Sequence, residues 1–302
     1  MRILNFGSCN IDHVYKMHHI VSPGETEASA KLETFPGGKG LNQSIALARA
    51  GAKVCHAGLV GGDGEWLKAL LSENGVDVSC LETAEDRKTG HAVIQVAESG
   101  ENSIILYGGC NREITKELAD RVLENFGEGD ILLLQNEISN LKYIVDKGYE
   151  KGMKIILNPA PFTEELKEID LKKLFCLIPN EVEAEALAGA DTPENNVKKL
   201  QSLCDGLRVL ITVGKKGSIY FDGEKLIKQP AFKVDAVDTT AAGDTFIGYF
   251  VASLSNGEDV AKALDIASCA SAIAVSRMGA AVSVPYMSEV KENIGKMKRV
   301  NI

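Results

Sequence analysis

Residues 131–157, ILLLQNEISNLKYIVDKGYEKGMKIIL, contain the pattern that decides the fold class. The apolar runs Ile131–Leu134 and Ile155–Leu157 are short enough to be buried strands, and Asn140–Lys151 between them has apolar residues at helical spacing. A strand, a helix and a second strand in this order predict a βαβ unit with two parallel strands.

Comparable segments extend this pattern along the chain. The other strand candidates are Ile3–Phe6, Val54–Val60, Cys176–Ile178, Leu207–Val213 and Ser218–Phe221. The other helical segments are Asp63–Asn74, Thr115–Phe126, Glu181–Ala188, Ala242–Leu254 and Val260–Val275. The alternation predicts an α/β fold with a mostly parallel sheet that carries helices on both faces.

Two regions interrupt the alternation. Residues 11–35 and 89–108 have the period-two pattern of strands and contain no helical segment. We expect them to pair into one small antiparallel sheet, a lid that packs on an α/β domain made of residues 1–10, 36–88 and 109–302. Apolar residues on both faces of Val93–Val96 and Ile104–Tyr107 need cover, which favours a homodimer through this lid.

Composition excludes several classes of protein. The 302 residues include 33 Lys and Arg against 42 Asp and Glu, a net charge of −9, which argues against general nucleic-acid binding. The chain has no apolar window long enough to span a membrane. Seven cysteines without a CxxC pair disfavour a disulfide framework or a zinc site, so the expected compartment is the cytoplasm.

The first motif that could bind a ligand is Gly37-Gly38-Lys39-Gly40-Leu41-Asn42-Gln43, placed between a lid strand and a helix that we expect to begin near Leu41. Its glycines permit close approach of a ligand to the backbone, and the start of a helix offers unpaired N–H groups. The motif is not a Walker A loop, because Gly40 and not Ser or Thr follows Lys39. The alternative is a tight strand-to-helix turn.

The second motif is Asp238-Thr239-Thr240-Ala241-Ala242-Gly243-Asp244, which precedes an apolar helix. Small residues at the positive end of a buried helix expose backbone amides and so can form an anion hole. Asp244 in the first turn can act beside it as a general base. This combination is what phosphoryl transfer to a hydroxyl requires. The alternative is a carboxylate that only complements the helix dipole.

Two further motifs follow strands. Asn180 and Glu183 are three residues apart after a strand end, where oxygen ligands could hold hydrated Mg²⁺ on a nucleotide; a helix-capping box has the same spacing. Residues 212–217, TVGKKG, could contact phosphates or cover a base, and an ordinary hairpin explains them equally well. Neither GxGxxG nor GxSxG occurs in the chain, which disfavours a dinucleotide-dependent dehydrogenase and a serine hydrolase.

Taken together, these motifs resemble those of the phosphofructokinase-B-type carbohydrate kinases, the ribokinase family, over essentially the whole chain. The resemblance implies a three-layer α/β/α sandwich with a small β-sheet lid. Residues 7–13, 23–26 and 38–43 are most similar to the members that phosphorylate D-ribose at its 5-hydroxyl with ATP. The alternatives are a kinase for deoxyribose, fructose, keto-deoxygluconate or an adenosine-type nucleoside, and a non-catalytic binding protein on the same scaffold.

The resemblance also implies a role for particular residues. Asp244 would be the base, beside an anion hole formed by the amides of Ala241, Ala242 and Gly243. Residues that would hold the sugar hydroxyls are Asn10, Asp12, Gly38, Lys39, Asn42 and Glu137. Residues that would contact ATP are Asn180, Thr212, Gly214 and Gly217.

Two cations are implied in the same way. Glu183 would position Mg²⁺ through water. A monovalent cation such as K⁺ would lie among Asp238, Thr240, Ala274, Arg277, Gly279 and Ser283. One departure from the family pattern concerns the Gly-Ala-Gly-Asp stretch, which reads Ala241-Ala242-Gly243-Asp244 here. We expect the added methyl of Ala241 to be tolerated if its φ angle is negative.

Overall fold

The computed structural model of the protein describes residues 1–189 and 192–301. Within these residues a nine-stranded sheet has the order β13-β12-β11-β10-β9-β8-β1-β4-β5. Its strands are β1 (Ile3–Phe6), β4 (Val54–Gly61), β5 (Asp77–Ala84), β8 (Ile131–Gln135), β9 (Lys154–Asn158), β10 (Leu174–Leu177), β11 (Arg208–Thr212), β12 (Gly217–Phe221) and β13 (Leu226–Pro230). All neighbours pair in parallel except β11–β12 and β12–β13, which form an antiparallel edge.

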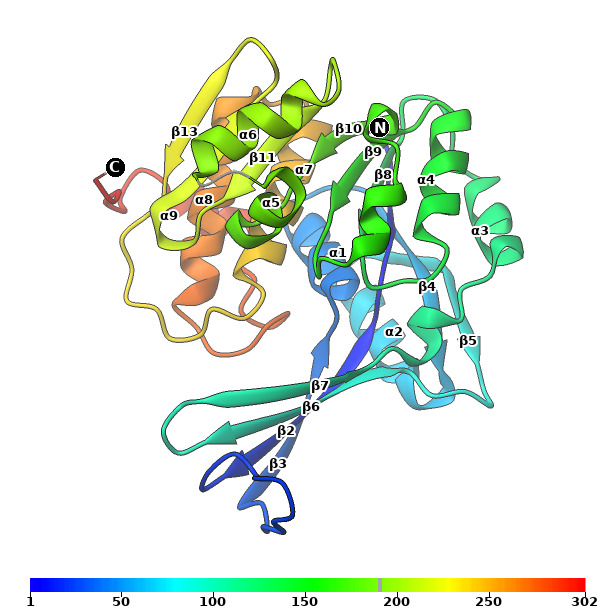
Figure 1. Cartoon of the computed structure of the whole chain (residues 1–302), viewed down its shortest axis with the longest axis vertical. Helices are drawn as coiled ribbons and strands as arrows, with labels where there is room; N and C mark the ends of the chain where they lie inside the picture. Colours follow the sequence, from blue (N-terminus) through cyan, green and yellow to red (C-terminus); the bar gives the residue numbers. More distant parts are fainter. Residues whose placement is uncertain (190–191, 302) are drawn as a thin grey trace.

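Helices cover both faces of this sheet (Figure 1). They are α1 (Lys39–Arg49), α2 (Glu65–Glu73), α3 (Lys116–Leu123), α4 (Leu141–Glu150), α5 (Glu181–Ala188), α6 (Pro193–Ser202), α7 (Ala242–Ser255), α8 (Val260–Val275) and α9 (Met287–Asn293). Short 3₁₀ turns are η1 (Gly62–Gly64), η2 (Gly109–Arg112), η3 (Glu164–Glu168), η4 (Leu171–Lys173) and η5 (Gly214–Lys216).

The alternation of side chains along each strand divides the core into two layers. On β8, Ile131 and Leu133 pack with helices α1, α2, α7, α8 and α9. Leu132 and Leu134 of the same strand face the other way and pack with α3, α4, α5 and α6. Each strand is therefore buried on both faces, which explains its continuous apolar sequence and confirms the predicted α/β/α sandwich.

The second sheet has the order β3-β2-β6-β7 and projects from the body of the molecule (Figure 1). Its strands are β2 (Asn10–Met17), β3 (Lys31–Gly37), β6 (Gly90–Ala97) and β7 (Asn102–Tyr107). The prediction of a purely antiparallel sheet was wrong, because β2 and β6 pair in parallel. Both strands leave the main body in the same direction, and only their return strands β3 and β7 run back. The domain division at residues 11–35 and 89–108 stays a prediction.

Helices α1 and α7 approach each other closely at a glycine. A Cβ atom placed on Gly248 of α7 would lie 2.4 Å from the Cβ of Ala46 and 3.0 Å from the carbonyl oxygen of Gln43, both on α1. Only a glycine therefore fits at this crossing without moving a helix. Residue 248 lies one turn after Asp244 on the same face of α7, so the crossing sets how near Asp244 comes to α1.

No helix in residues 1–189 and 192–301 has the length and apolar character needed to cross a membrane.

Candidate active site

Helix α1 begins at Lys39, directly after Gly38, whose φ angle is +93°. A Cβ on Gly38 would approach the carbonyl oxygen of Ser8 and the amide nitrogen of Asn10 to 3.0 Å. The first N–H groups of the helix are already paired. That of Lys39 donates to Glu137 Oε2 at 3.0 Å, and those of the next two residues donate to the hydroxyl and carbonyl oxygens of Ser8.

The prediction that this helix start offers free N–H groups was therefore wrong. Ser8 follows β1 and Glu137 follows β8, and these two neighbouring strands bring their side chains to the same edge of the sheet. Ser8 Oγ also donates to Glu137 Oε2, so the two residues form one closed cap on α1.

Helix α7 begins differently. Its first residues follow Ala241, which has a φ angle of +58°. The condition under which the added methyl should be tolerated is thus not met. The N–H of Ala242 donates to the carbonyl oxygen of Thr239 at 3.2 Å, which closes a turn with Ala241 at its third position, where a positive φ normally favours Gly or Asn. Within the described residues the N–H groups of Ala241 and Gly243 have no partner, so this helix start is open.

Asp244 is buried in the first turn of α7 and is held by two amide side chains of α1. Asn42 Nδ2 donates to Oδ2 at 3.1 Å, and Gln43 Nε2 donates to Oδ1 at 2.9 Å. Because each carboxylate oxygen accepts from a different residue, the plane of the carboxylate is fixed. The Oδ1 atom of Asn42 is buried and has no hydrogen-bond partner in residues 1–189 and 192–301, which leaves an acceptor beside Asp244.

Sequence reasoning assigned no role to Gln43. This side chain is fully buried, and its Oε1 accepts from Gln135 Nε2 at 2.7 Å. Gln135 in turn donates to Asn5 Oδ1 at 2.9 Å, and Gln43 also donates to Asn158 Oδ1 at 3.2 Å. A chain of buried amides thus orients the donor that faces Asp244. Gln43 lies in the glycine-rich motif before α1. The direction of its side chain depends on the residue at which α1 begins.

Lys39 lies among three carboxylates from different parts of the chain. Burial alone lowers the pKa of its ammonium group, but the charges of Asp244, Glu137 and Glu183 outweigh burial and raise that pKa. Burial raises the pKa of Glu183, an effect that hydrogen bonding from Asn180 and the charge of Lys39 oppose. The structure therefore groups the predicted base, sugar-binding and Mg²⁺ residues around one cation.

The lid contributes Asn10 and Asp12 from the inner end of β2. Asn10 is buried, and its Oδ1 accepts from Asn111 Nδ2 at 2.7 Å. The carboxylate of Asp12 lies against Gly37, where an added Cβ would come within 2.4 Å of both of its oxygens. Burial and, secondarily, the charge of Glu137 raise the pKa of Asp12 to about 6. The first motif and the lid thus share one site.

A cavity of about 580 Å³ opens beside the start of α7. Ala242 and Gly243 line it, as do the predicted nucleotide residues Thr212, Gly214 and Gly217. Lys215 and Lys216 of the predicted 212–217 turn also line it, together with residues that sequence reasoning missed, among them Phe232, Lys233 and Ser268. Apolar walls with cations at the rim are suited to a flat base that carries phosphates.

Asn180 and Glu183 form the capping box that was the alternative interpretation. Asn180 Oδ1 accepts from the Glu183 N–H at 2.9 Å, and Glu183 Oε2 accepts from the Asn180 N–H at 2.9 Å. A backbone bridge also places Asn180 beside Thr212. The pair therefore begins α5 at the edge of the nucleotide cavity. Residues in this position can cap the helix and also lie close enough to a nucleotide to contact it.

The residues predicted to hold a monovalent cation are only partly brought together. The two oxygens of Asp238 accept from the N–H groups of Thr240 and Gly279, both at 2.9 Å. Burial raises the pKa of Asp238, but these hydrogen bonds outweigh it and lower the pKa. The carbonyl of Ala274 accepts from the Arg277 N–H. The Arg277 guanidinium pairs with Glu289, and the Ser283 hydroxyl donates to Ala280.

The sequence matches the pfkB family of carbohydrate kinases over residues 2–287. The ribokinase of Haemophilus influenzae is 36% identical over 294 residues, 95% of this chain and 96% of that protein. The ribokinase of Bacillus subtilis is 37% identical over 290 residues, 95% of this chain and 97% of that protein. The structure of Arabidopsis thaliana ribokinase complexed with ribose and ATP is 30% identical, has a TM-score of 0.85 and covers 97% of this chain and 98% of that one. The chain therefore belongs to the pfkB family of carbohydrate kinases.

Proposed function

We propose that the protein transfers the γ-phosphoryl group of ATP to the 5-hydroxyl of D-ribose. The observation that carries this proposal is the fixed Asp244 carboxylate, which lies between the polar residues of α1 and the open start of α7 beside a cavity. The full-length similarity to proteins named ribokinase supports the choice of sugar.

The sugar would bind where the lid meets α1. Its hydroxyls would donate to Asp12 and Glu137 and would be held by Asn10, Lys39 and the backbone at Gly38. The buried, unpartnered Oδ1 of Asn42 supports this placement, because a sugar hydroxyl would supply the missing donor beside the base. Such a site should discriminate against sugars that lack a hydroxyl, since a buried polar group would then stay unpaired.

ATP would occupy the cavity lined by Thr212, Gly214, Gly217 and Gly243. In the reaction, Asp244 takes the proton from the 5-hydroxyl, and the resulting oxyanion attacks the γ-phosphorus in line. The bond from that phosphorus to its bridging oxygen breaks, and ADP leaves. The free amides of Ala241 and Gly243 would stabilise negative charge on the phosphoryl group. The Ala242 amide could join them only if it released Thr239.

The donor set around Glu183 fits a hydrated Mg²⁺ ion. The carboxylate is buried, and each of its oxygens accepts from Asn180 and still has acceptor capacity for a metal-bound water. Bound there, Mg²⁺ would neutralise charge on the nucleotide phosphates. Glu183 would orient that water, and Asn180 would fix Glu183 and offer its amide to a phosphate.

We also propose the monovalent cation site at the loop before α7. Asp238 supplies an ionised carboxylate, and the backbone carbonyls of Thr240, Ala274, Arg277 and Gly279 with the Ser283 hydroxyl supply oxygens that suit K⁺. Both Asp238 oxygens already hold the loop in shape, so a cation there would act on the anion hole through Thr240. Replacing K⁺ with choline in the assay should lower activity.

Dimerisation through the lid is the proposed quaternary structure. Ile104, Ile105, Leu106 and Tyr107 on the edge strand β7 are all more than half exposed. An apolar edge strand of this kind is stabilised by a second copy. Light scattering across micromolar concentrations tests this. The cytoplasmic location stays a prediction from the sequence.

The decisive experiment is a panel of sugars and nucleosides with ATP and detection of ADP. D-ribose should give the highest kcat/KM, ahead of deoxyribose, fructose, keto-deoxygluconate and adenosine. A higher value for another member of the panel would replace ribose as the substrate. No ADP formation with any of them would contradict the proposal and favour a binding protein.

A further inference from the structure

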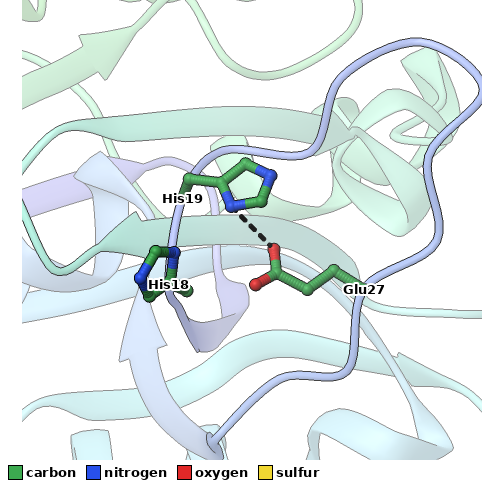
Figure 2. Close-up of side chains that lie close together, drawn as sticks. All are labelled: His18, His19 and Glu27. Atoms are coloured by element: carbon green, nitrogen blue, oxygen red, sulfur yellow. Dashed lines mark ion pairs between the residues drawn. The ribbon is translucent and has the colours of Figure 1, made fainter.

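The loop that joins β2 to β3 brings two histidines and a glutamate together at the outer part of the lid (Figure 2). One ligand atom each from His18, His19 and Glu27 lies within 4.8 Å of the other two. The loop sequence from residue 18 to residue 27, HHIVSPGETE, contains no lysine or arginine. The local charge is therefore negative, and the kinase site described above uses none of these side chains.

The hydrogen bonds of His19 decide which of its nitrogens is available. Its Nε2 lies 2.8 Å from Glu25 Oε1, and a carboxylate can only accept, so Nε2 carries a proton. Glu25 is itself fixed, because its Oε2 accepts from the N–H of Ser22 at 2.9 Å. A carboxylate that holds one ring nitrogen in this way orients the other for a metal.

The remaining nitrogen faces an oxygen that lacks a donor. His19 Nδ1 lies 3.5 Å from Glu27 Oε2 (Figure 2). This oxygen is buried and has no hydrogen-bond partner among the residues that the structure describes. With Nε2 protonated in the neutral ring, lone pairs of Nδ1 and Oε2 face each other, and either a proton on Nδ1 or a metal cation between the two atoms removes the conflict. Two ligands at about 2.0–2.2 Å from a tetrahedral zinc ion lie roughly 3.3–3.6 Å apart, which matches this separation.

We propose that His18, His19 and Glu27 bind one divalent transition-metal ion of the zinc type, with Glu25 as the residue that orients His19. The two imidazole ligands favour such ions over Mg²⁺. His18 also lies near Glu98 in the β6–β7 turn, at 3.9 Å between Nε2 and Oε2. The bound ion orders the β2–β3 loop beside that turn.

The test uses the metal-depleted, full-length protein and zinc, titrated in competition with a coloured zinc indicator. The wild type should bind one more zinc ion per chain than His19→Ala or Glu27→Gln. Glu25→Ala should weaken this binding by about 10–100-fold, as loss of an outer-shell partner does. Counting the difference between variants separates this site from any zinc bound near Glu183.

The matched control is His13→Ala. His13 and His91 form the lid's other histidine pair, with ring centroids 6.0 Å apart, and no three-residue metal cluster was found around them in the described residues. This variant should keep the extra zinc ion. Deuterium exchange should show slower uptake in residues 18–27 with zinc in the wild type and in His13→Ala, but not in His19→Ala. Equal zinc binding by wild type and His19→Ala, or equal loss in His13→Ala, would overturn the proposal.

Discussion

Helices α1 and α7 lie side by side, and both begin after a residue with left-handed backbone, yet their starts have opposite properties. Ser8 and Glu137 fill the start of α1, so none of its first N–H groups is left for a ligand. The start of α7 keeps free amides beside the large cavity. A glycine-rich sequence before a helix therefore does not by itself identify an anion site. Whether an anion can bind depends on whether neighbouring side chains already accept from the first N–H groups of the helix.

The largest expected effect on kcat comes from a substitution at the start of α7. Asp244→Asn should lower kcat by about 10²–10⁴-fold, the usual contribution of a general base, while ribose still binds. Steady-state assays and calorimetry with ribose measure both quantities. Asp259→Asn is the matched control, because Asp259 also lies at a helix start, where it accepts from the Lys262 N–H, and it is not among the proposed site residues. Near-normal turnover by the Asp244 variant would remove it from the mechanism.

The next effect tests whether α1 positions the base in α7. Gln43→Glu places a second carboxylate 2.9 Å from Asp244 Oδ1, where Gln43 now donates. Like charges this close raise the pKa of the pair, so the acid limb of the kcat–pH profile should move to higher pH, and kcat at neutral pH should fall by about 10–100-fold.

Gln229→Glu is the control for this variant. Gln229 is buried and donates to Asp265 at 3.2 Å rather than to Asp244, so the same change there should leave the acid limb in place. An unshifted profile in Gln43→Glu would show that Gln43 is only structural.

A substitution at Gly38 should disrupt the start of α1. Gly38→Ala should destabilise the fold by about 2–4 kcal/mol, because the residue is left-handed and its new Cβ meets backbone atoms of Ser8 and Asn10. Gly75→Ala carries the same backbone penalty at φ +82° with open space around it, and should cost about 1–2 kcal/mol. Denaturant unfolding measures both. Equal losses would show that the contacts at Gly38 do not matter.

Ribose binding should depend on pH through Asp12. With the pKa of Asp12 at about 6, its carboxylate is mostly charged at pH 7 and mostly protonated at pH 5. Protonation removes an acceptor for sugar hydroxyls, so the Kd for ribose should rise about tenfold between pH 7 and pH 5. Calorimetry without ATP measures this, and Asp12→Asn should abolish the dependence. A constant Kd in the wild type would contradict the assignment of Asp12.

The smallest effect concerns Ala241. Ala241→Gly should stabilise the protein by about 0.5–1 kcal/mol, because relief of the left-handed alanine exceeds the entropy that glycine loses. Ala242→Gly, one residue later in the helix itself, should be neutral or destabilising. Thermal unfolding compares the two. A loss of stability in Ala241→Gly would mean that its methyl group makes a favourable contact.

Strands with a continuous apolar sequence, such as Ile131–Leu134, could be predicted because both faces are buried. The edge strands β5 and β13 could not be predicted in this way. Their exposed faces carry charged residues such as Glu82 and Lys228, which interrupt the apolar run. Helices α6 and α9 were missed as well, and both have mostly polar sequences.

Part of the site was predictable for the same kind of reason. Lys39 and Asp244 stand in motifs rich in small residues, which a helix cap alone does not require. The filling of the α1 start could not be predicted, because Glu137 lies 98 residues beyond Lys39 in the chain. The positive φ of Ala241 and the direction of Gln43 depend on where helices begin, which residue patterns locate only to within a few positions.

Gly248 lies where α7 crosses α1. This residue would meet neither sugar nor nucleotide, yet its missing side chain lets α7 rest against Ala46 and holds the proton acceptor within reach of two amides on the neighbouring helix. A bulkier residue there would move α7 away from α1 and would lower kcat without contacting either substrate. Inhibitor-resistance or variant surveys restricted to ligand-contacting positions would overlook it.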